Sequence, residues 1–208
     1  MTPIPRTRVK ICGITHPQDG VIAANLGADA IGLVFHPSSP RYVDTETARR
    51  IIAVLPPFIS TVGLFRNEEP AAIRSVLAAI PLAMVQFHGD EDPDYCAAFG
   101  VPYLKAVPMG AGADMADYER QFATAAGLLL DSHGDNKMGG TGQGFDWTKI
   151  PTERHKPLIL AGGLHPGNVA EAIRQVRPYA VDVSSGVESA KGIKDAELMR
   201  KFLRGVRL

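Results

Sequence analysis

Residues 8–35 read RVKICGITHPQDGVIAANLGADAIGLVF and contain one strand–helix–strand unit. The apolar run Arg8–Cys12 predicts a strand. Pro17 then begins a helical stretch that ends at Gly27, with proline at the start and glycine at the end of the helix. Ala30–Phe35 predicts the next strand. Both apolar runs are nearly continuous, which is typical of parallel strands that are covered on both faces.

The same unit recurs along the rest of the chain. Further strands are predicted over Ser60–Phe65, Ala83–Phe87, Pro102–Val107, Gly127–Asp131, Pro157–Ala161 and Tyr179–Val183, and helices over Thr45–Leu55, Ala71–Ile80, Gly167–Val176 and Ala196–Arg204. Eight such units in 208 residues predict an α/β fold, a single (β/α)8 TIM barrel that spans residues 1–208 as one catalytic domain. The competing fold is an open doubly wound sheet, which usually has GxGxxG after its first strand. Here Cys12-Gly13-Ile14-Thr15 stands at that place, which favours the barrel.

The charge balance and the cysteine count exclude several classes of protein. Lysine plus arginine (22) equals aspartate plus glutamate (22), which argues against a dedicated binder of nucleic acid or membrane surfaces. The two cysteines cannot form a disulfide framework, and no Cys-x-x-Cys pair suggests zinc. Residues 1–8 lack the apolar core of a signal peptide, and no segment approaches the roughly 18 apolar residues of a membrane span. We therefore expect a cytoplasmic protein.

Polar residues crowd the predicted carboxyl ends of the strands, where barrel enzymes carry their active sites. These residues are Cys12, His36, Arg66, His88, Asp131, Ser132, Gly162, Gly163, Ser184, Ser185 and Gly186. Alternation along a strand places Lys10 on the same face as Cys12, and Gln86 on the same face as His88. If Cys12 points into the barrel, Lys10 lies one layer deeper and needs an acidic partner, which Asp182 could supply.

Two glycine-containing loops predict a phosphate site. Gly162-Gly163 and Ser184-Ser185-Gly186 follow the last two strands, and such loops let backbone N–H groups approach an anion closely. Each motif alone could be a tight turn, but barrel enzymes often hold phosphate in these two loops. A phosphorylated small molecule is therefore the expected ligand.

Cys12 and Asp131 are the candidates for acid–base chemistry. A free cysteine is usually a small buried hydrophobe, but Cys12 ends a strand and could act as a thiolate whose pKa nearby positive charge lowers. Asp131 follows three leucines and could be a helix cap, a loop ligand or an acid, and partial burial would favour its protonated form. Arg41 could be a surface arginine or could bind a substrate carboxylate. Residues 132–144 contain five glycines and predict a mobile active-site loop, and the histidines share no spacing that suits a metal.

These residues belong to an ordered set of motifs that resembles the phosphoribosylanthranilate isomerase family of tryptophan biosynthesis. The matching stretches are Lys10-Ile11-Cys12-Gly13-Ile14-Thr15, Gly27-Ala28-Asp29, Ser39-Pro40-Arg41, Val62-Gly63-Leu64-Phe65, Gln86-Phe87-His88-Gly89, Gly139-Gly140-Thr141-Gly142 with Phe145-Asp146-Trp147, Ala161-Gly162-Gly163-Leu164, Asp182-Val183-Ser184-Ser185-Gly186-Val187-Glu188 and Gly192-Ile193-Lys194-Asp195. They extend from the first predicted strand to the last predicted helix.

The resemblance implies a cofactor-free Amadori rearrangement of N-(5-phosphoribosyl)anthranilate, an aminoaldose, to 1-(2-carboxyphenylamino)-1-deoxyribulose 5-phosphate, an aminoketose. It implies Cys12 as general base, Asp131 as general acid, Arg41 at the anthranilate carboxylate, and the loops at Gly162-Gly163 and Ser184-Ser185-Gly186 at the phosphate. His88 is a further residue of the expected pocket, and a monomer and a homodimer remain open.

Two other functions compete with this interpretation. Another ribose-phosphate barrel enzyme, such as an indole-glycerol-phosphate synthase or a pentose-phosphate epimerase, would need a Lys/Glu set or a metal-binding His/Asp set at the strand ends, and we see neither. A phosphate-binding barrel without catalysis is the other class, and the presence of both Cys12 and Asp131 argues against it.

Overall fold

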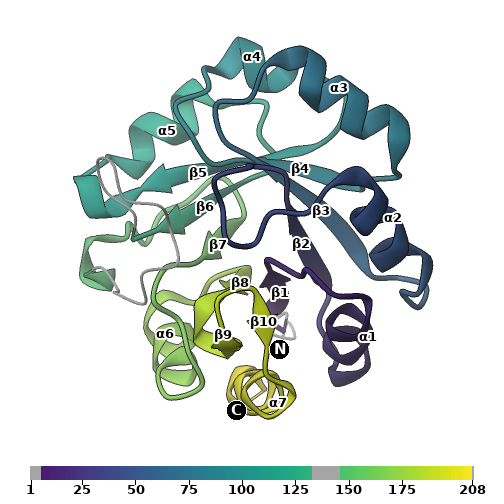
Figure 1. Cartoon of the computed structure of the whole chain (residues 1–208). Helices are drawn as coiled ribbons and strands as arrows, with labels where there is room; N and C mark the ends of the chain where they lie inside the picture. Colours follow the sequence, from purple (N-terminus) through teal and green to yellow (C-terminus); the bar gives the residue numbers. More distant parts are fainter. Residues whose placement is uncertain (1–5, 133–145, 208) are drawn as a thin grey trace.

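A computed structural model describes residues 6–132 and 146–207 of the chain. Its parallel strands β1 to β8 follow one another in chain order and close into a barrel, with β8 paired to β1 (Figure 1). The strands are β1 (Arg8–Cys12), β2 (Ala30–Val34), β3 (Ser60–Phe65), β4 (Met84–Phe87), β5 (Tyr103–Pro108), β6 (Gly127–Asp131), β7 (Leu158–Leu160) and β8 (Ala180–Val183). The predicted barrel is confirmed, and each predicted strand differs from the observed one by no more than one residue at an end.

Helices cover the outside of the barrel (Figure 1). They are α1 (Pro17–Leu26), α2 (Thr45–Ala53), α3 (Pro70–Ala79), α4 (Pro93–Ala97), α5 (Met115–Gln121), α6 (Val169–Val176) and α7 (Ala196–Val206). Asp44 caps α2 by accepting a hydrogen bond from the Thr47 amide at 2.7 Å, and Gly27 ends α1 with a φ of 98°. Between β6 and β7, the described residues hold only the short 3-10 turn η2 (Trp147–Lys149).

The expected start of a helix at Gly167 is wrong, because α6 begins two residues later at Val169. The Gly167 amide donates to the ring of His165 at 3.1 Å, and the Asn168 side chain accepts from the His165 amide at 2.8 Å. These local hydrogen bonds hold residues 165–168 as a turn, which delays the helix.

The barrel interior is apolar on one side and polar on the other. Its apolar cluster consists of Leu104, Ala106, Leu129, Ile159, Ala161 and Ala180, from β5 to β8 and the loop after β7. Toward β1, β4 and β8, the interior instead contains Lys10, Gln86 and Asp182, and all three side chains are buried. A larger apolar cluster lies between the strands and the helices. The polar side of the interior lies directly beneath the candidate site.

A small hairpin after β8 was not among the predicted elements. The 3-10 turn η3 (Ser185–Val187) leads into β9 (Glu188–Ala190), which pairs antiparallel with β10 (Ile193–Lys194). Figure 1 places this hairpin beside β8 and β1. Thr15, in the loop after β1, donates to the Gly192 carbonyl and so joins that loop to the hairpin.

None of the helices in the described part of the chain is both long and apolar enough to cross a membrane.

Candidate active site

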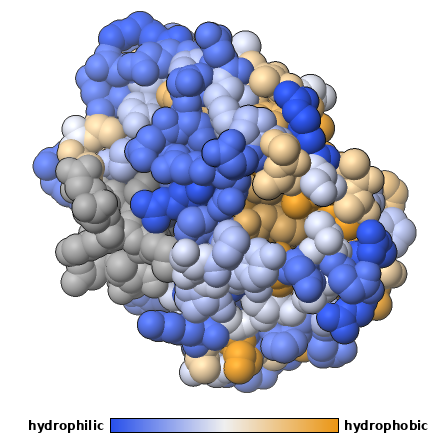
Figure 2. All heavy atoms as spheres, turned by 45° about the horizontal axis from the view of Figure 1, so that its top comes forward, coloured by the Kyte–Doolittle hydropathy of each residue, from blue (hydrophilic) through white to orange (hydrophobic). Residues whose placement is uncertain are grey.

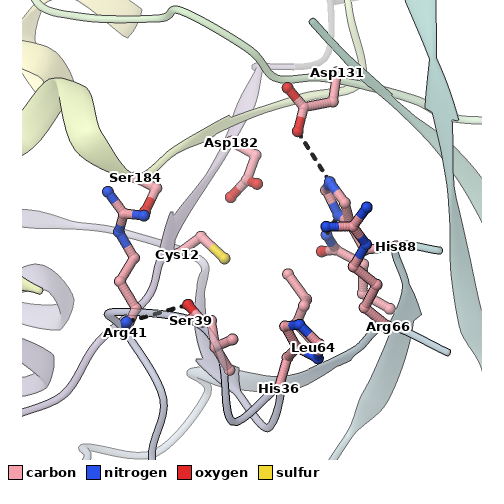
Figure 3. Close-up of a pocket in the computed structure, with 12 residues that line it drawn as sticks. Cys12, His36, Ser39, Arg41, Leu64, Arg66, His88, Asp131, Asp182 and Ser184 are labelled. Carbon is pink, nitrogen blue, oxygen red and sulfur yellow. Dashed lines mark hydrogen bonds and ion pairs between the residues drawn. The ribbon is translucent and has the colours of Figure 1, made fainter. Parts of the chain in front are cut away.

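A cavity at the carboxyl ends of the strands brings most of the predicted site residues together (Figure 3). Its lining residues are Cys12, Val34, His36, Ser39, Arg41, Leu64, Arg66, Gln86, His88, Asp131, Asp182 and Ser184. The view in Figure 2 shows hydrophilic residues over much of one face of the molecule, next to a smaller hydrophobic area. Cys12 and Asp131 therefore line one cavity, although 119 positions separate them in the sequence.

Cys12 ends β1, and the neighbouring strand leaves room for its sulfur. Cys12 pairs in register with Gly32 on β2, where a Cβ atom would lie only 2.6 Å from the Cys12 Sγ. The residue is 5% exposed, and this burial raises the pKa of the thiol, although Lys10 and Lys194 act in the opposite direction. The expected lowering of the Cys12 pKa is therefore wrong for the substrate-free protein, because the loss of hydration outweighs the nearby positive charges.

The space at Gly32 leads to a prediction. In Gly32→Ala, the new methyl group would collide with the Cys12 Sγ, so we expect the thiol to be displaced and turnover to fall by at least tenfold while the barrel stays folded. Steady-state kinetics and thermal unfolding would measure the two effects. Gly20→Ala in α1 is a matched control, because its nearest new contact is the end of the Leu55 side chain at 3.2 Å. Equal losses of activity in both variants would contradict this role of Gly32.

Asp131 ends β6 and faces His88 across the cavity. The Nε2 atom of His88 lies 3.0 Å from Asp131 Oδ2, as Figure 3 shows. Asp131 is 5% exposed, and its strand neighbour Leu129 lies in the barrel interior as the alternation predicts. Gly162 has a φ of 77°, and a Cβ there would collide with the Ser132 backbone and lie 2.8 Å from Asp131 Oδ1. Glycine at position 162 therefore permits the loop after β7 to pack against the acid.

A buried polar chain lies beneath the cavity. Lys10 Nζ lies 3.0 Å from Asp182 Oδ1 and 2.9 Å from Gln86 Oε1, and Gln86 Nε2 lies 2.8 Å from His88 Nδ1. The predicted partnership of Lys10 with Asp182 is confirmed. Burial is the largest single effect on Lys10 and lowers its pKa, but the charges of Asp182 and Cys12 and the hydrogen bonds with them together outweigh burial and leave the pKa raised, so Lys10 stays protonated. The sequence placed Gln86 and His88 on one face but did not indicate that Gln86 joins His88 to Lys10.

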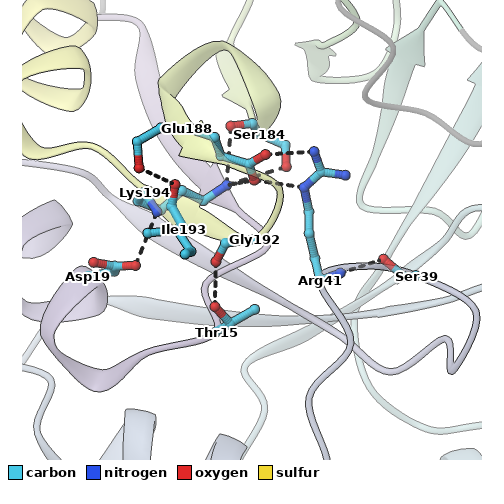
Figure 4. Close-up of polar contacts among 10 residues, drawn as sticks. Thr15, Asp19, Ser39, Arg41, Ser184, Glu188, Gly192, Ile193 and Lys194 are labelled. Atoms are coloured by element: carbon cyan, nitrogen blue, oxygen red, sulfur yellow. Dashed lines mark hydrogen bonds and ion pairs between the residues drawn. The ribbon is translucent and has the colours of Figure 1, made fainter.

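Arg41 lies in the cavity wall, and its guanidinium binds Glu188. Arg41 Nε and Nη2 lie 2.7 and 2.8 Å from the two carboxylate oxygens of Glu188 (Figure 4). Lys194 Nζ also binds Glu188, at 2.8 Å, and reaches the Ser184 carbonyl at 3.1 Å. Burial acts to raise the pKa of Glu188, but hydrogen bonds from Arg41 and the charge of Lys194 leave that pKa lowered. The hairpin thus anchors Arg41 beside Ser184.

A second arginine, Arg66 after β3, faces the cavity from the opposite wall (Figure 3). It has no hydrogen bond or ion pair with any residue that the structure describes. His36 also lines the cavity, and its Nδ1 lies 2.8 Å from a carboxylate oxygen of Glu68. Among the described residues, the cavity therefore holds one arginine that is paired with a carboxylate, Arg41, and one that is not, Arg66.

The two loops predicted to bind phosphate are neighbours in the structure. Gly162 and Gly163 have φ values of 77° and 69°, and Gly186 lies so close to the Leu164 carbonyl that a Cβ would not fit. Ser185 and Gly186 form part of the three-residue turn η3, so no regular helix starts there. Among the five residues predicted for phosphate, Ser184 lines the cavity and the other four lie in the adjoining loops.

Several residues of the site were missed by reasoning from the sequence. Glu188 and Lys194 stand within motifs of the family resemblance, but nothing in the sequence pairs them with Arg41 and Ser184, because the hairpin that carries them was not expected. The predicted mobile loop and the Gly139-Gly140-Thr141-Gly142 motif fall on residues 133–145, which lie outside the described residues.

The family model and the curated relatives of this chain name one family. The family model of N-(5'-phosphoribosyl)anthranilate isomerase matches residues 9–205. The chain is similar to the N-(5'-phosphoribosyl)anthranilate isomerase of Stutzerimonas stutzeri, with 54% identity over 204 residues that cover 98% of this chain and 99% of that protein.

Solved structures of the same name resemble the barrel closely. The phosphoribosyl anthranilate isomerase of Thermotoga maritima has a TM-score of 0.88 and 41% identity, with 97% of this chain and 98% of that one covered. A second structure holds reduced 1-(o-carboxyphenylamino)-1-deoxyribulose 5-phosphate, and it matches with a TM-score of 0.80 and 39% identity over 97% of this chain and 98% of that one.

Proposed function

The chain belongs to the N-(5'-phosphoribosyl)anthranilate isomerase family, isomerases of tryptophan biosynthesis, and from this we propose that Cys12 is the general base and Asp131 the general acid of the rearrangement. The substrate is N-(5-phosphoribosyl)anthranilate, and the product is 1-(2-carboxyphenylamino)-1-deoxyribulose 5-phosphate. The two compounds are isomers, so the reaction needs only internal proton transfers. The observation that carries the proposal is the placement of Cys12 and Asp131 in the wall of one cavity.

Asp131 would act first, by opening the ribose ring. Its carboxyl proton passes to the ring oxygen while the bond from that oxygen to C1 breaks. The nitrogen lone pair of the anthranilate forms a double bond to C1, which leaves a protonated imine and a carboxylate on Asp131. This role is supported by the position of Asp131, which ends β6 and lines the cavity.

Cys12 would act second, by removing the proton on C2. The imine makes this C–H bond acidic, and its electron pair forms the C1–C2 double bond of an enolamine. The proton passes to the Cys12 thiolate, and the enolamine then tautomerises to the ketone. Burial leaves the pKa of the Cys12 thiol raised, so only the ionised fraction of Cys12 acts as the base, and Lys10 and Lys194 increase that fraction because each acts to lower this pKa.

The two anionic ends of the substrate need different partners. The loops at Gly162-Gly163 and Ser184-Ser185-Gly186 offer backbone N–H groups for the phosphate, as helix ends and glycine-rich turns do in other phosphate sites. Arg41 offers its guanidinium to the anthranilate carboxylate, which would join Glu188 as its second anionic partner. Holding both ends places the ribose between Cys12 and Asp131.

Purified protein tests this function directly. The substrate is made in situ from anthranilate and a phosphoribosyl donor, and its fluorescence is expected to disappear when the chain is added. Unchanged fluorescence at high protein concentration would contradict the proposal. The same assay after exhaustive chelation is expected to give full activity, whereas a requirement for metal would favour an epimerase-type mechanism.

Arg41→Ala is expected to weaken turnover of the natural substrate more than turnover of an analogue that lacks the ring carboxylate, because only the first uses the guanidinium. The measurement is kcat/KM for both compounds. Arg49→Ala, in which an exposed arginine of α2 loses its contact with Glu46, serves as the control and should leave both values unchanged. If Arg41→Ala lowered kcat/KM equally for the two compounds, Arg41 would not bind the ring carboxylate, and its role would be only to bind Glu188.

A further inference from the structure

Gln86 stands in the middle of the buried polar chain that joins Asp182, Lys10, His88 and Asp131. The links are Lys10 Nζ to Asp182 at 3.0 Å, Lys10 Nζ to Gln86 Oε1 at 2.9 Å, Gln86 Nε2 to His88 Nδ1 at 2.8 Å, and His88 Nε2 to Asp131 Oδ2 at 3.0 Å. The Gln86 side chain has no exposed surface, and Lys10 is 5% exposed. Water therefore cannot replace these contacts, and each donor must face an acceptor.

The donors and acceptors in this chain can be assigned from chemistry alone. A lysine ammonium group has three donors and no acceptor, so the Gln86 atom next to Lys10 must be the amide oxygen. The amide nitrogen of Gln86, which can only donate, then faces His88 Nδ1. Nδ1 must accept that hydrogen bond and cannot carry a proton. The ring proton of His88 is therefore on Nε2, which donates to Asp131 Oδ2.

We propose that Gln86 is a positioning residue that keeps His88 neutral, with its proton on Nε2, beside the catalytic carboxyl of Asp131. This inference rests on the proposed role of Asp131 as the acid. An imidazolium at His88 would place a full positive charge next to Asp131 and hold it as a carboxylate, which has no proton to give. A neutral ring donates one hydrogen bond without that charge, and the Gln86 N–H excludes the second proton.

The same assignment distinguishes the two oxygens of Asp131, because only one of them faces the His88 N–H. Oδ2 accepts the N–H of His88, so a proton on Oδ2 would face another donor. Oδ1 is therefore the oxygen on which a catalytic proton would not face the His88 N–H. The neighbouring Ser132 Oγ lies 3.5 Å from Oδ1, on the side of the loop that follows β6.

NMR of the full, substrate-free chain tests the tautomer. Long-range ¹H–¹⁵N spectra of the ¹⁵N-labelled protein distinguish a ring protonated on Nε2, a ring protonated on Nδ1 and an imidazolium, and comparison with His88→Asn identifies the ring of His88. At pH 7 we expect the neutral ring with its proton on Nε2. A proton on Nδ1, in either the neutral or the charged ring, would overturn the assignment.

Two variants of Gln86 then test its role in turnover. In Gln86→Glu, a carboxylate can accept from Nδ1, so we expect a doubly protonated His88 and a kcat that falls at least tenfold, up to the roughly 10²–10⁴-fold that a general acid contributes. In Gln86→Met, which keeps the volume and removes both hydrogen bonds, we expect a smaller loss of kcat and a ring no longer confined to one tautomer. KM should stay within about threefold in both.

The controls separate this inference from the proposed function. Gln175→Glu makes the same chemical change on the exposed side of α6 and should change neither the His88 spectrum nor kcat. Wild-type kcat in a Gln86→Glu protein whose His88 is doubly protonated would overturn the role of Gln86. The substrate-free spectra do not depend on what Asp131 does in turnover, so failure of the acid assignment is detected separately, as high activity of Asp131→Asn.

Discussion

Cys12→Ala is expected to lower kcat by roughly 10²–10⁴-fold, the usual contribution of a general acid or base, while substrate affinity changes little. The thiolate is the proposed acceptor of the C2 proton, and alanine leaves no acceptor at the end of β1. The fold should survive, because the substitution removes one sulfur from a residue at the cavity wall rather than from the apolar cluster between sheet and helices. Steady-state kinetics and the melting temperature measure both effects.

Cys96 provides the matched control for this substitution. It is the other free cysteine, it is 1% exposed in α4, and burial raises the pKa of its thiol to about 12. Cys96→Ala is expected to lower the melting temperature slightly and to leave kcat within about threefold of the wild type. If Cys12→Ala behaved in the same way, Cys12 would have no part in the chemistry.

The raised pKa of Cys12 predicts how the rate of its alkylation depends on pH. Only the thiolate reacts with iodoacetamide, and a pKa above the ordinary value means that little thiolate is present at neutral pH. The alkylation rate of Cys12, followed by mass spectrometry, should therefore continue to rise with pH beyond the point at which a free cysteine levels off. A rate that is already constant below pH 8 would show that the positive charges of Lys10 and Lys194 outweigh burial.

Asp131→Asn is expected to reduce kcat by a similar factor, roughly 10²–10⁴, because the amide has no acidic proton for the ribose oxygen. The substitution keeps the shape of the side chain, and its oxygen can still accept from His88 Nε2. KM should stay within about threefold, and the reduced product analogue seen in the related structure should bind with nearly unchanged affinity in calorimetry.

Asp114→Asn tests whether the loss is specific to position 131. Asp114 caps α5 by accepting from the Ala116 amide at 2.8 Å, and asparagine is an equally good cap. This control should keep wild-type kinetics and stability. Turnover of Asp131→Asn at more than about a third of the wild-type rate would assign the acid role to another group.

The barrel was predictable from the sequence because each strand is a short apolar run bounded by turn residues, as Gly127–Asp131 illustrates. A short, nearly continuous apolar run indicates that both faces of a strand are buried, and this is typical of parallel strands. The alternation of side chains also predicted the buried pair of Lys10 and Asp182. The position of the cavity followed from strand direction alone, since all eight strands end at the same side of the barrel.

The sequence could not predict the contacts between residues that are far apart along the chain and that only the fold brings together. The pairing of Arg41 with Glu188 joins residues 147 positions apart through a hairpin whose strands are only two and three residues long. The direction of the Cys12 pKa shift depends on how much water reaches the thiol and on its distance from Lys10, and composition reports neither. The sequence likewise placed Gln86 and His88 on one face of a strand, but it did not indicate that Lys10, on another strand, binds Gln86 in the barrel interior.

The buried layer of Lys10, Gln86 and Asp182 also affects how far this barrel can be made resistant to heat. Replacing a buried ion pair with well-packed apolar side chains of similar volume is often neutral or stabilising. The barrel could therefore have a higher melting temperature with apolar residues in this layer. The same layer reaches Asp131 through His88, and its lysine acts to lower the pKa of Cys12. Engineering for higher operating temperature should therefore leave these three positions alone and work on the outer helices, where stabilising changes do not compete with turnover.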